Sequence, residues 1–176
     1  MREYERNFEE AFNAHADELF RHAAVRLPSR ERALEITQDC FLKAWEYASR
    51  GEEIREFRPF LYRILKNLII DEYRKHKTES LEGLVDEEEG EHIDTLLPPD
   101  ETNTLEAAVA RLDGAKALAA LPNLPLSYRE VLTFRYVDGL SPSEIAKVLE
   151  TNENVVSVRI HRGLKRLREL LYGNEP

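Results

Sequence analysis

Apolar residues recur every three or four positions along most of the chain, which is the spacing of a helix with one buried side. In the first half the pattern predicts three helices, over residues 3–27, 29–48 and 59–77. Pro28 and Gly51 mark where the first two end, and Pro59 marks where the third begins. Alternation typical of a strand occurs nowhere, so the sequence predicts an all-α protein.

Helical periodicity resumes at Leu105 and predicts a helix that stops at Pro122. Ser127 and Glu130 have the spacing of a capping box, which predicts the start of the next helix. A second capping box, Ser141 with Glu144, predicts a short helix that begins with Pro142. Asn152 is a favourable N-cap for a final helix that runs to about Leu171.

The final helix has two different sides. One side carries the apolar stripe Val156, Ile160, Leu164, Leu167 and Leu171. The other side carries Asn154, Val158, His161, Arg162, Lys165 and Arg168. A short helix, a tight turn and a basic outer face are typical of a helix-turn-helix that places its second helix in the DNA major groove. An amphipathic hairpin with a solvated charged face explains the same pattern, so both interpretations stay open.

The net charge of −9 argues against a nucleic-acid binder only until its distribution is considered. Residues 79–106 hold 11 Asp or Glu and no Lys or Arg, so the rest of the chain carries 25 basic and 23 acidic residues. Low hydrophobicity and like charge predict a flexible acidic linker at 79–106. We therefore expect one helical domain at residues 1–78 and another at 107–173.

The third predicted helix also has two faces. Leu61, Ile64, Leu65 and Leu68 are expected to face inward. The opposite face carries Arg63, Lys66, Asn67, Ile70 and Arg74, flanked by Tyr62 and Tyr73. Cations that hold phosphates and rings that stack on bases suit single-stranded or opened DNA. A surface helix whose tyrosines cover the edge of a core is the alternative.

Other classes of protein find little support. No metal-ligand spacing, glycine-rich phosphate loop or nucleophile motif is evident, so we expect no enzyme, cofactor or small-molecule substrate. His15 and His22 are interpreted as ordinary helix residues, and Cys40 as a buried thiol in a reducing cytoplasm. No signal peptide and no apolar run of roughly 20 residues is present, which predicts a cytoplasmic protein without membrane insertion.

Two groups of residues together resemble one known family. The first group comprises Ile36–Trp45, Phe57–Asn67 and Asp71. The second comprises Leu121–Pro122, Arg129–Val131, Gly139–Ser141, Glu144–Ala146 and Arg159–Arg162. In this order and separation they resemble the two conserved domains of the extracytoplasmic-function (ECF) group of bacterial RNA polymerase sigma factors. The resemblance implies two small helical domains that bind core RNA polymerase and promoter DNA, often regulated by an anti-sigma protein.

The resemblance also implies roles for individual residues. Core polymerase would contact Gln38, Asp39, Phe41, Leu42 and Trp45. The segment 48–58 would capture a base flipped from the melted minus-10 element. That element would be read by Phe57, Arg58, Tyr62, Arg63, Lys66, Asn67, Ile70 and Arg74. The minus-35 element would be read by Asn152, Asn154, Ser157, Val158, Arg159, His161, Arg162 and Lys165.

Two features depart from the usual pattern of this group, and a third is unusual for a solvated helix face. Glu150 occupies the turn where glycine is common, and a positive φ there would cost roughly 1 kcal/mol or more. Glu153 and Asn154 place little positive charge at the tip of the last helix, although a glutamate can accept a hydrogen bond from cytosine. Val158 on the predicted outer face suggests packing against a thymine methyl group.

Two further interpretations stay open. The acidic linker could follow the path of nascent RNA and imitate that polyanion, or it could be a soluble tether. The chain could also be a stand-alone regulator with the same helix-turn-helix, or a protein-binding helical adaptor.

Overall fold

The computed structural model describes residues 3–79 and 114–173, and the chain divides into two units, Met1–Glu89 and Gly90–Pro176. The described residues form helices and connecting turns without strands, which confirms the predicted all-α class. The predicted linker, except for its first residue, and the first part of the helix predicted from Leu105 lie outside the described residues.

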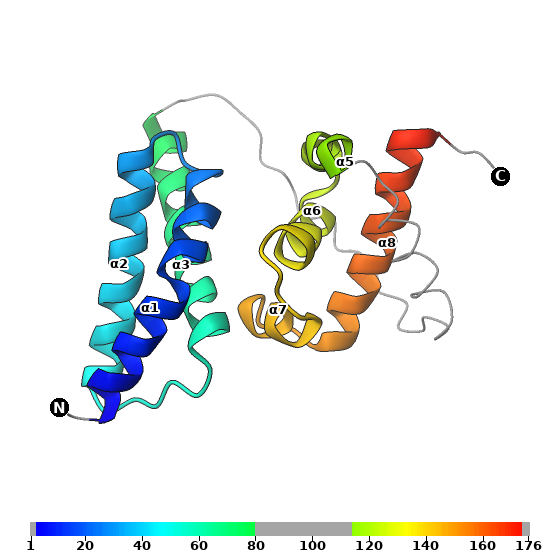
Figure 1. Cartoon of the computed structure of the whole chain (residues 1–176). Helices are drawn as coiled ribbons and strands as arrows, with labels where there is room; N and C mark the ends of the chain where they lie inside the picture. The colour runs from blue at the N-terminus through cyan, green and yellow to red at the C-terminus, as the bar shows by residue number, and fades with distance from the viewer. Residues whose placement is uncertain (1–2, 80–113, 174–176) are drawn as a thin grey trace. The chain divides into compact units, whose positions relative to one another are not determined.

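Unit 1 is a bundle of three helices, α1 (Glu3–Ala24), α2 (Arg30–Ser49) and α3 (Phe57–Glu79), which lie alongside one another (Figure 1). Ser29 caps α2 as predicted, and its hydroxyl accepts a hydrogen bond from the Arg32 backbone N–H at 3.1 Å. The fully buried residues of this core are Leu19, Ala23, Ala33, Cys40, Ala44, Leu61, Tyr62 and Leu65. Cys40 is buried as predicted, and burial raises the pKa of its thiol to about 12.

The buried stripe of α3 differs from the predicted one. Leu61 and Leu65 are buried as expected, whereas Ile64 and Leu68 are partly exposed. The other buried positions of α3 are Pro59, Tyr62, Ile69 and Glu72. The physical reason is that α3 packs against both α1 and α2, so that its buried side is set by two neighbours and not by its own apolar residues alone.

Unit 2 consists of short helices that support one long helix. In chain order they are α5 (Gly114–Ala120), the 3₁₀ turn η1 (Leu121–Asn123), α6 (Leu126–Leu132), the π-helical turn η2 (Thr133–Val137), α7 (Pro142–Val148) and α8 (Glu153–Tyr172). Helix α8 packs against α5, α6 and α7. Gly163 lies at the closest approach, where an added Cβ would be 3.2 Å from both the Tyr128 Cβ and the Leu132 Cδ1.

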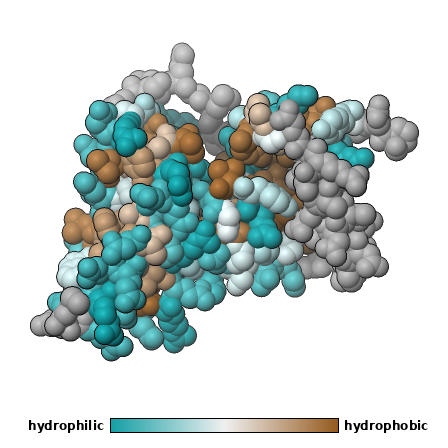
Figure 2. Space-filling view, in the orientation of Figure 1, coloured by the Kyte–Doolittle hydropathy of each residue, from teal (hydrophilic) through white to brown (hydrophobic). Residues whose placement is uncertain are grey.

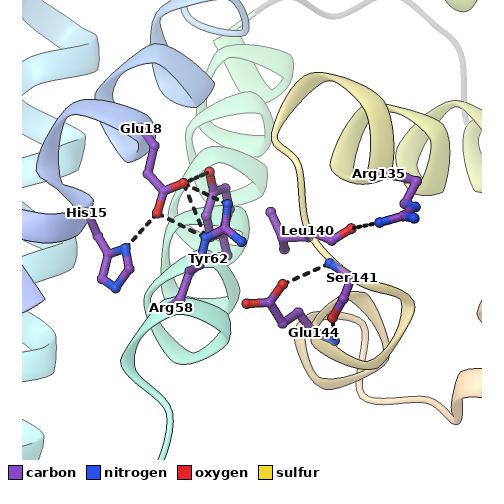
Figure 3. Close-up of polar contacts among 8 residues, drawn as sticks. All are labelled: His15, Glu18, Arg58, Tyr62, Arg135, Leu140, Ser141 and Glu144. Atoms are coloured by element: carbon purple, nitrogen blue, oxygen red, sulfur yellow. Dashed lines mark hydrogen bonds and ion pairs between the residues drawn. The ribbon is translucent and has the colours of Figure 1, made fainter.

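The predicted helix starts in unit 2 are mostly confirmed. The backbone N–H of Ser141 donates to Glu144 Oε2 at 2.8 Å and the Ser141 hydroxyl accepts from the Glu144 N–H, so the capping box of α7 is complete (Figure 3). Asn152 caps α8 as predicted. The predicted box at Ser127 is wrong, because α6 begins at Leu126 with Pro125 as its N-cap and no side chain caps it.

Candidate DNA and polymerase interfaces

The exposed side of α2 carries three of the five residues predicted to contact polymerase. Gln38, Asp39 and Leu42 are exposed, and Leu42 has 55% of its surface accessible. These three neighbouring side chains form a solvent-exposed surface on α2 in which two polar residues lie beside one leucine. Other apolar side chains also reach the surface of this unit among hydrophilic ones (Figure 2).

The two aromatic residues of the same set have a different position. Phe41 is 5% exposed and packs edge-on against Phe12 and Phe8, with ring centroids 4.8 and 6.1 Å away. Trp45 is partly exposed and packs on Phe8 and Tyr4 at 5.1 and 5.5 Å. The ring of Phe41 therefore holds α1 against α2, and its contact with polymerase stays a prediction.

A shallow groove of about 280 Å³ lies between α1 and α2 beside these residues. Its lining includes Phe41, Gln38, Phe12 and Leu34. Phe12 is 48% exposed and Leu34 is 50% exposed. Helical periodicity did not predict this groove, because it forms between two helices and depends on how they pack together.

The outer side of α3 carries most of the residues predicted to read the minus-10 element. Asn67 and Arg74 are exposed, whereas Arg63, Lys66 and Ile70 are partly exposed. The Arg63 guanidinium lies 5.4 Å from the centre of the Phe60 ring, and Arg74 lies 3.8 Å from the Asp71 carboxylate. These residues lie on one helix, so a rigid surface with cationic and apolar groups faces solvent.

Tyr62 does not belong to this surface. Its side chain is fully buried, its hydroxyl lies 3.5 Å from Glu18 Oε2, and its ring packs edge-on against His22 at 5.3 Å. The expectation that Tyr62 flanks a DNA-binding face is therefore wrong. The aromatic body fills the core between α1 and α3, while the hydroxyl finds a polar partner, which is the usual arrangement of a buried tyrosine.

Phe57 and Arg58 form the first turn of α3, directly after the segment 51–56. Phe57 is partly exposed and packs against Phe8 at 6.4 Å. Arg58 donates two hydrogen bonds from Nε to the Glu18 carboxylate, at 3.1 and 3.2 Å, and one from Nη2 at 2.9 Å. Sequence reasoning missed Glu18, although an acid between His15 and His22 on a largely buried stripe of α1 was a detectable signal.

A second ion pair between helices connects α2 to the C-terminal half of α3. Arg32 donates from Nε and Nη2 to the two Glu72 oxygens, both at 2.6 Å, and the Glu72 side chain is 6% exposed. His76 Nε2 lies 3.3 Å from the same carboxylate. Hydrogen bonds from Arg32 lower the pKa of Glu72 against the opposing effect of burial, with a smaller contribution from His76.

The exposed side of α8 is narrower than predicted. Asn152, Asn154 and Lys165 are exposed, and Ser157, Arg159 and Arg162 are partly exposed. Val158 and His161 are only 3% and 8% exposed. Their placement on an outer face, and with it the packing of Val158 on a thymine methyl, is therefore wrong. Because α8 has helices on more than one side, it buries more than its single apolar stripe.

The turn between α7 and α8 has a positive φ at Glu150, the position where the family commonly has glycine. Glu150 has φ 54°, the one positive value at a residue other than glycine among the described residues. The backbone N–H of Thr151 donates to the Ala146 carbonyl at 2.9 Å across the turn. The side-chain oxygen of Asn152 accepts from the Val155 N–H at 2.9 Å, so this oxygen is used for capping and leaves the amide NH₂ of Asn152 for any DNA contact.

Within residues 3–79 and 114–173, no helix is long and apolar enough to cross a membrane. The same residues contain no group of three or more His, Cys, Asp or Glu side chains that could hold a metal ion.

Comparisons with known proteins identify both units. Residues 11–79 match Sigma-70 region 2, and residues 115–167 match Sigma-70, region 4. The two matched regions together define a sigma factor of the sigma-70 family. The chain is also 32% identical to the ECF RNA polymerase sigma factor SigW of Bacillus subtilis over 171 residues, which are 93% of this chain and 88% of SigW.

Another relative is the ECF RNA polymerase sigma factor SigL of Mycobacterium tuberculosis, 32% identical over 89% of this chain and 84% of SigL. The structure of the sigma factor RpoE of Bartonella quintana, solved with the anti-sigma factor NepR, has the same fold, with a TM-score of 0.64 and 21% identity over 97% of this chain and 99% of RpoE. The chain therefore belongs to the ECF group of RNA polymerase sigma factors, proteins of promoter-specific transcription initiation.

Proposed function

We propose that this sigma factor divides its work between the two units as follows. Residues 1–78 bind core RNA polymerase and read and melt the minus-10 element, residues 107–173 read the minus-35 element, and residues 79–106 connect the two domains. The observation that carries this proposal is that each matched family region presents an exposed polar or cationic helix face, on α2 and α3 in unit 1 and on α8 in unit 2. The chain acts as a binding protein without catalysis of its own, in the cytoplasm, where polymerase and promoters lie.

For polymerase, the proposed contact surface consists of Gln38, Asp39 and Leu42 of α2, with the partly exposed Trp45 at its edge. An exposed leucine between polar side chains is an arrangement suited to an amphipathic partner helix. Phe12 and Leu34 extend the apolar part of this surface along the groove between α1 and α2.

For the minus-10 element, the proposed readers are Arg63, Lys66, Asn67, Ile70 and Arg74 on α3. Opening a duplex costs unstacking and unpairing energy, so the protein must recover it by binding the displaced base and the phosphates. Cationic side chains beside a short connecting segment provide both kinds of contact.

For the minus-35 element, the proposed readers are Asn154, Ser157, Arg159, Arg162 and Lys165, with the amide NH₂ of Asn152. Side-chain amides pair with adenine edges, and arginine and lysine pair with guanine or phosphate. Asn154 is in the first turn of α8, the part of a recognition helix that contacts bases.

Reconstitution with purified core polymerase tests this assignment. The holoenzyme should select a two-part promoter from random duplex DNA and start transcription from it in vitro. Specific duplex binding by the chain alone, without binding to core enzyme at micromolar concentration, would support a stand-alone regulator and contradict the proposal.

We further propose regulation by an anti-sigma protein that covers the α2 surface. RpoE of Bartonella quintana, which shares the fold, is described in complex with the anti-sigma factor NepR. The half-exposed Phe12, Leu34 and Leu42 are an apolar surface that such a partner would protect from water.

A further inference from the structure

The Glu18 carboxylate lies where α1 meets the first turn of α3 (Figure 3). It accepts hydrogen bonds from Arg58 at 2.9–3.2 Å, lies 2.6 Å from His15 Nδ1 and lies 3.5 Å from the Tyr62 hydroxyl. The side chains of Glu18 and Arg58 are 18% and 25% exposed. A fork-like guanidinium that is bound through two of its nitrogens has one preferred orientation.

This ion pair holds its charged form despite partial burial. Burial opposes ionisation of Glu18, but the hydrogen bonds from Arg58 and His15 outweigh it and lower the pKa of the carboxyl group. The charge of Arg58 is therefore paired within unit 1, and a DNA phosphate would have to compete with Glu18 for it.

The Arg58–Glu18 pair lies directly after the segment 51–56 and anchors the C-terminal end of that segment. At one end of this segment, Gly51 has φ 87° and its N–H donates to the Ala48 carbonyl at 3.1 Å. At the other end, the first turn of α3 is fixed to α1 by the Arg58–Glu18 pair and by the packing of Phe57 on Phe8. Few residues separate two anchored ends, so a shift of the α3 anchor moves the segment directly.

We propose that Glu18 is a positioning residue for base capture: it fixes Arg58 and, through Arg58, the segment 51–56 that receives an unpaired minus-10 base. In this proposal Arg58 holds the segment 51–56 in position and does not itself bind a phosphate. This inference rests on the proposed function of unit 1. It makes a distinct prediction, because a positioning residue affects the preference between bases, whereas a phosphate contact affects all sequences equally.

The test uses holoenzyme assembled from core polymerase and the full chain, with single-stranded DNA oligonucleotides that carry the selected minus-10 element. Each position is varied through all four bases, and the affinity of each oligonucleotide is measured. At the captured position the wild-type holoenzyme should prefer its base by about 5- to 100-fold. In Glu18→Gln this preference should fall to about twofold, while affinity for core polymerase is unchanged and positions read by α3 keep their preference.

Two further variants separate positioning from loss of stability. Glu72→Gln removes the carboxylate of the Arg32–Glu72 ion pair, which is far from the segment 51–56 along α3. It should lower the denaturation midpoint comparably and keep the preference for the captured base. The double variant Glu18→Arg/Arg58→Glu restores opposite charges at the two positions and should recover most of the preference that either single substitution loses.

Three results would overturn the inference. An unchanged base preference in Glu18→Gln would show that the pair does not position the segment. Stronger binding of Glu18→Gln to every oligonucleotide, without a change in preference, would show that Arg58 is a phosphate contact that Glu18 restrains. Failure of the double variant to recover the base preference would show that pairing between positions 18 and 58 does not position the segment. By contrast, a wild-type holoenzyme without base preference would refute the minus-10 assignment itself, and the inference with it.

Discussion

Substitution of Glu150 by glycine should stabilise unit 2. Glu150 is the residue after the C-cap of α7, and its φ of 54° allows the Thr151 N–H to reach back to the Ala146 carbonyl. This is the hydrogen bond of a Schellman motif, which usually has glycine at the left-handed position. Glutamate therefore holds a backbone conformation that its own Cβ disfavours.

The size of the effect follows from two opposing contributions. A left-handed conformation costs a residue with a side chain about 1–2 kcal/mol. Glycine removes this cost but loses more conformational freedom on folding, which offsets roughly 0.5–1 kcal/mol. The net gain is about 0.5–1 kcal/mol, which corresponds to a rise of roughly 2–8 °C in the melting temperature of a unit of this size.

Thermal unfolding without DNA, followed by circular dichroism, measures the gain. The only tryptophan, Trp45, belongs to unit 1, so its fluorescence reports on the other unit and should show no shift. Glu150→Gln is the matched control, because it removes the charge and retains the Cβ atom. If glutamine stabilises unit 2 as much as glycine does, charge repulsion and not backbone strain is responsible, and the reasoning is refuted.

Three other predictions concern packing and pH. Val158→Ala should cost unit 2 about 1.5 kcal/mol in chemical denaturation and leave promoter preference unchanged; an altered base preference at constant stability would contradict its burial. Gly163→Val should destabilise unit 2 by roughly 1–3 kcal/mol, because Tyr128 and Leu132 leave no room for a side chain, and an unchanged melting temperature would argue against that contact. Folding lowers the pKa values of Glu18 and Glu72 below their ordinary value of 4.5. Both carboxylates therefore stabilise unit 1 at pH values above 4.5, and this stabilisation is lost as the pH falls through their folded pKa values. Trp45 fluorescence in urea at a series of pH values should show this loss, and Glu18→Gln/Glu72→Gln should show less of it.

Local features of unit 2 were largely predictable. The capping box at Ser141 and the N-cap at Asn152 involve residues only three positions apart, so their hydrogen bonds are a property of the local chain. The positive φ at Glu150 was predictable from the family pattern, in which glycine is common at this turn. At Ser127 the capping-box rule was wrong by two residues, because Pro125 is the N-cap of α6.

The faces of the helices were less predictable. Tyr62 and Val158 were expected to face DNA because each was placed on the outer side of its own helix, whereas the contact of Phe41 with polymerase was expected from the family resemblance. All three are buried, since α2 and α3 each touch two helices and α8 touches three. A periodic pattern identifies the centre of a buried stripe, but the width of that stripe depends on how many neighbours the helix has.

The amino-acid sequence alone determined the helical class, the capped starts of α2, α7 and α8, and the family to which the chain belongs, because these depend on residue types at short and regular spacing. Only the tertiary structure decided that Glu18 meets Arg58 and that Arg32 meets Glu72, since each pair joins residues 40 positions apart. Such contacts form only when helices pack, and they determine which cations remain available to DNA.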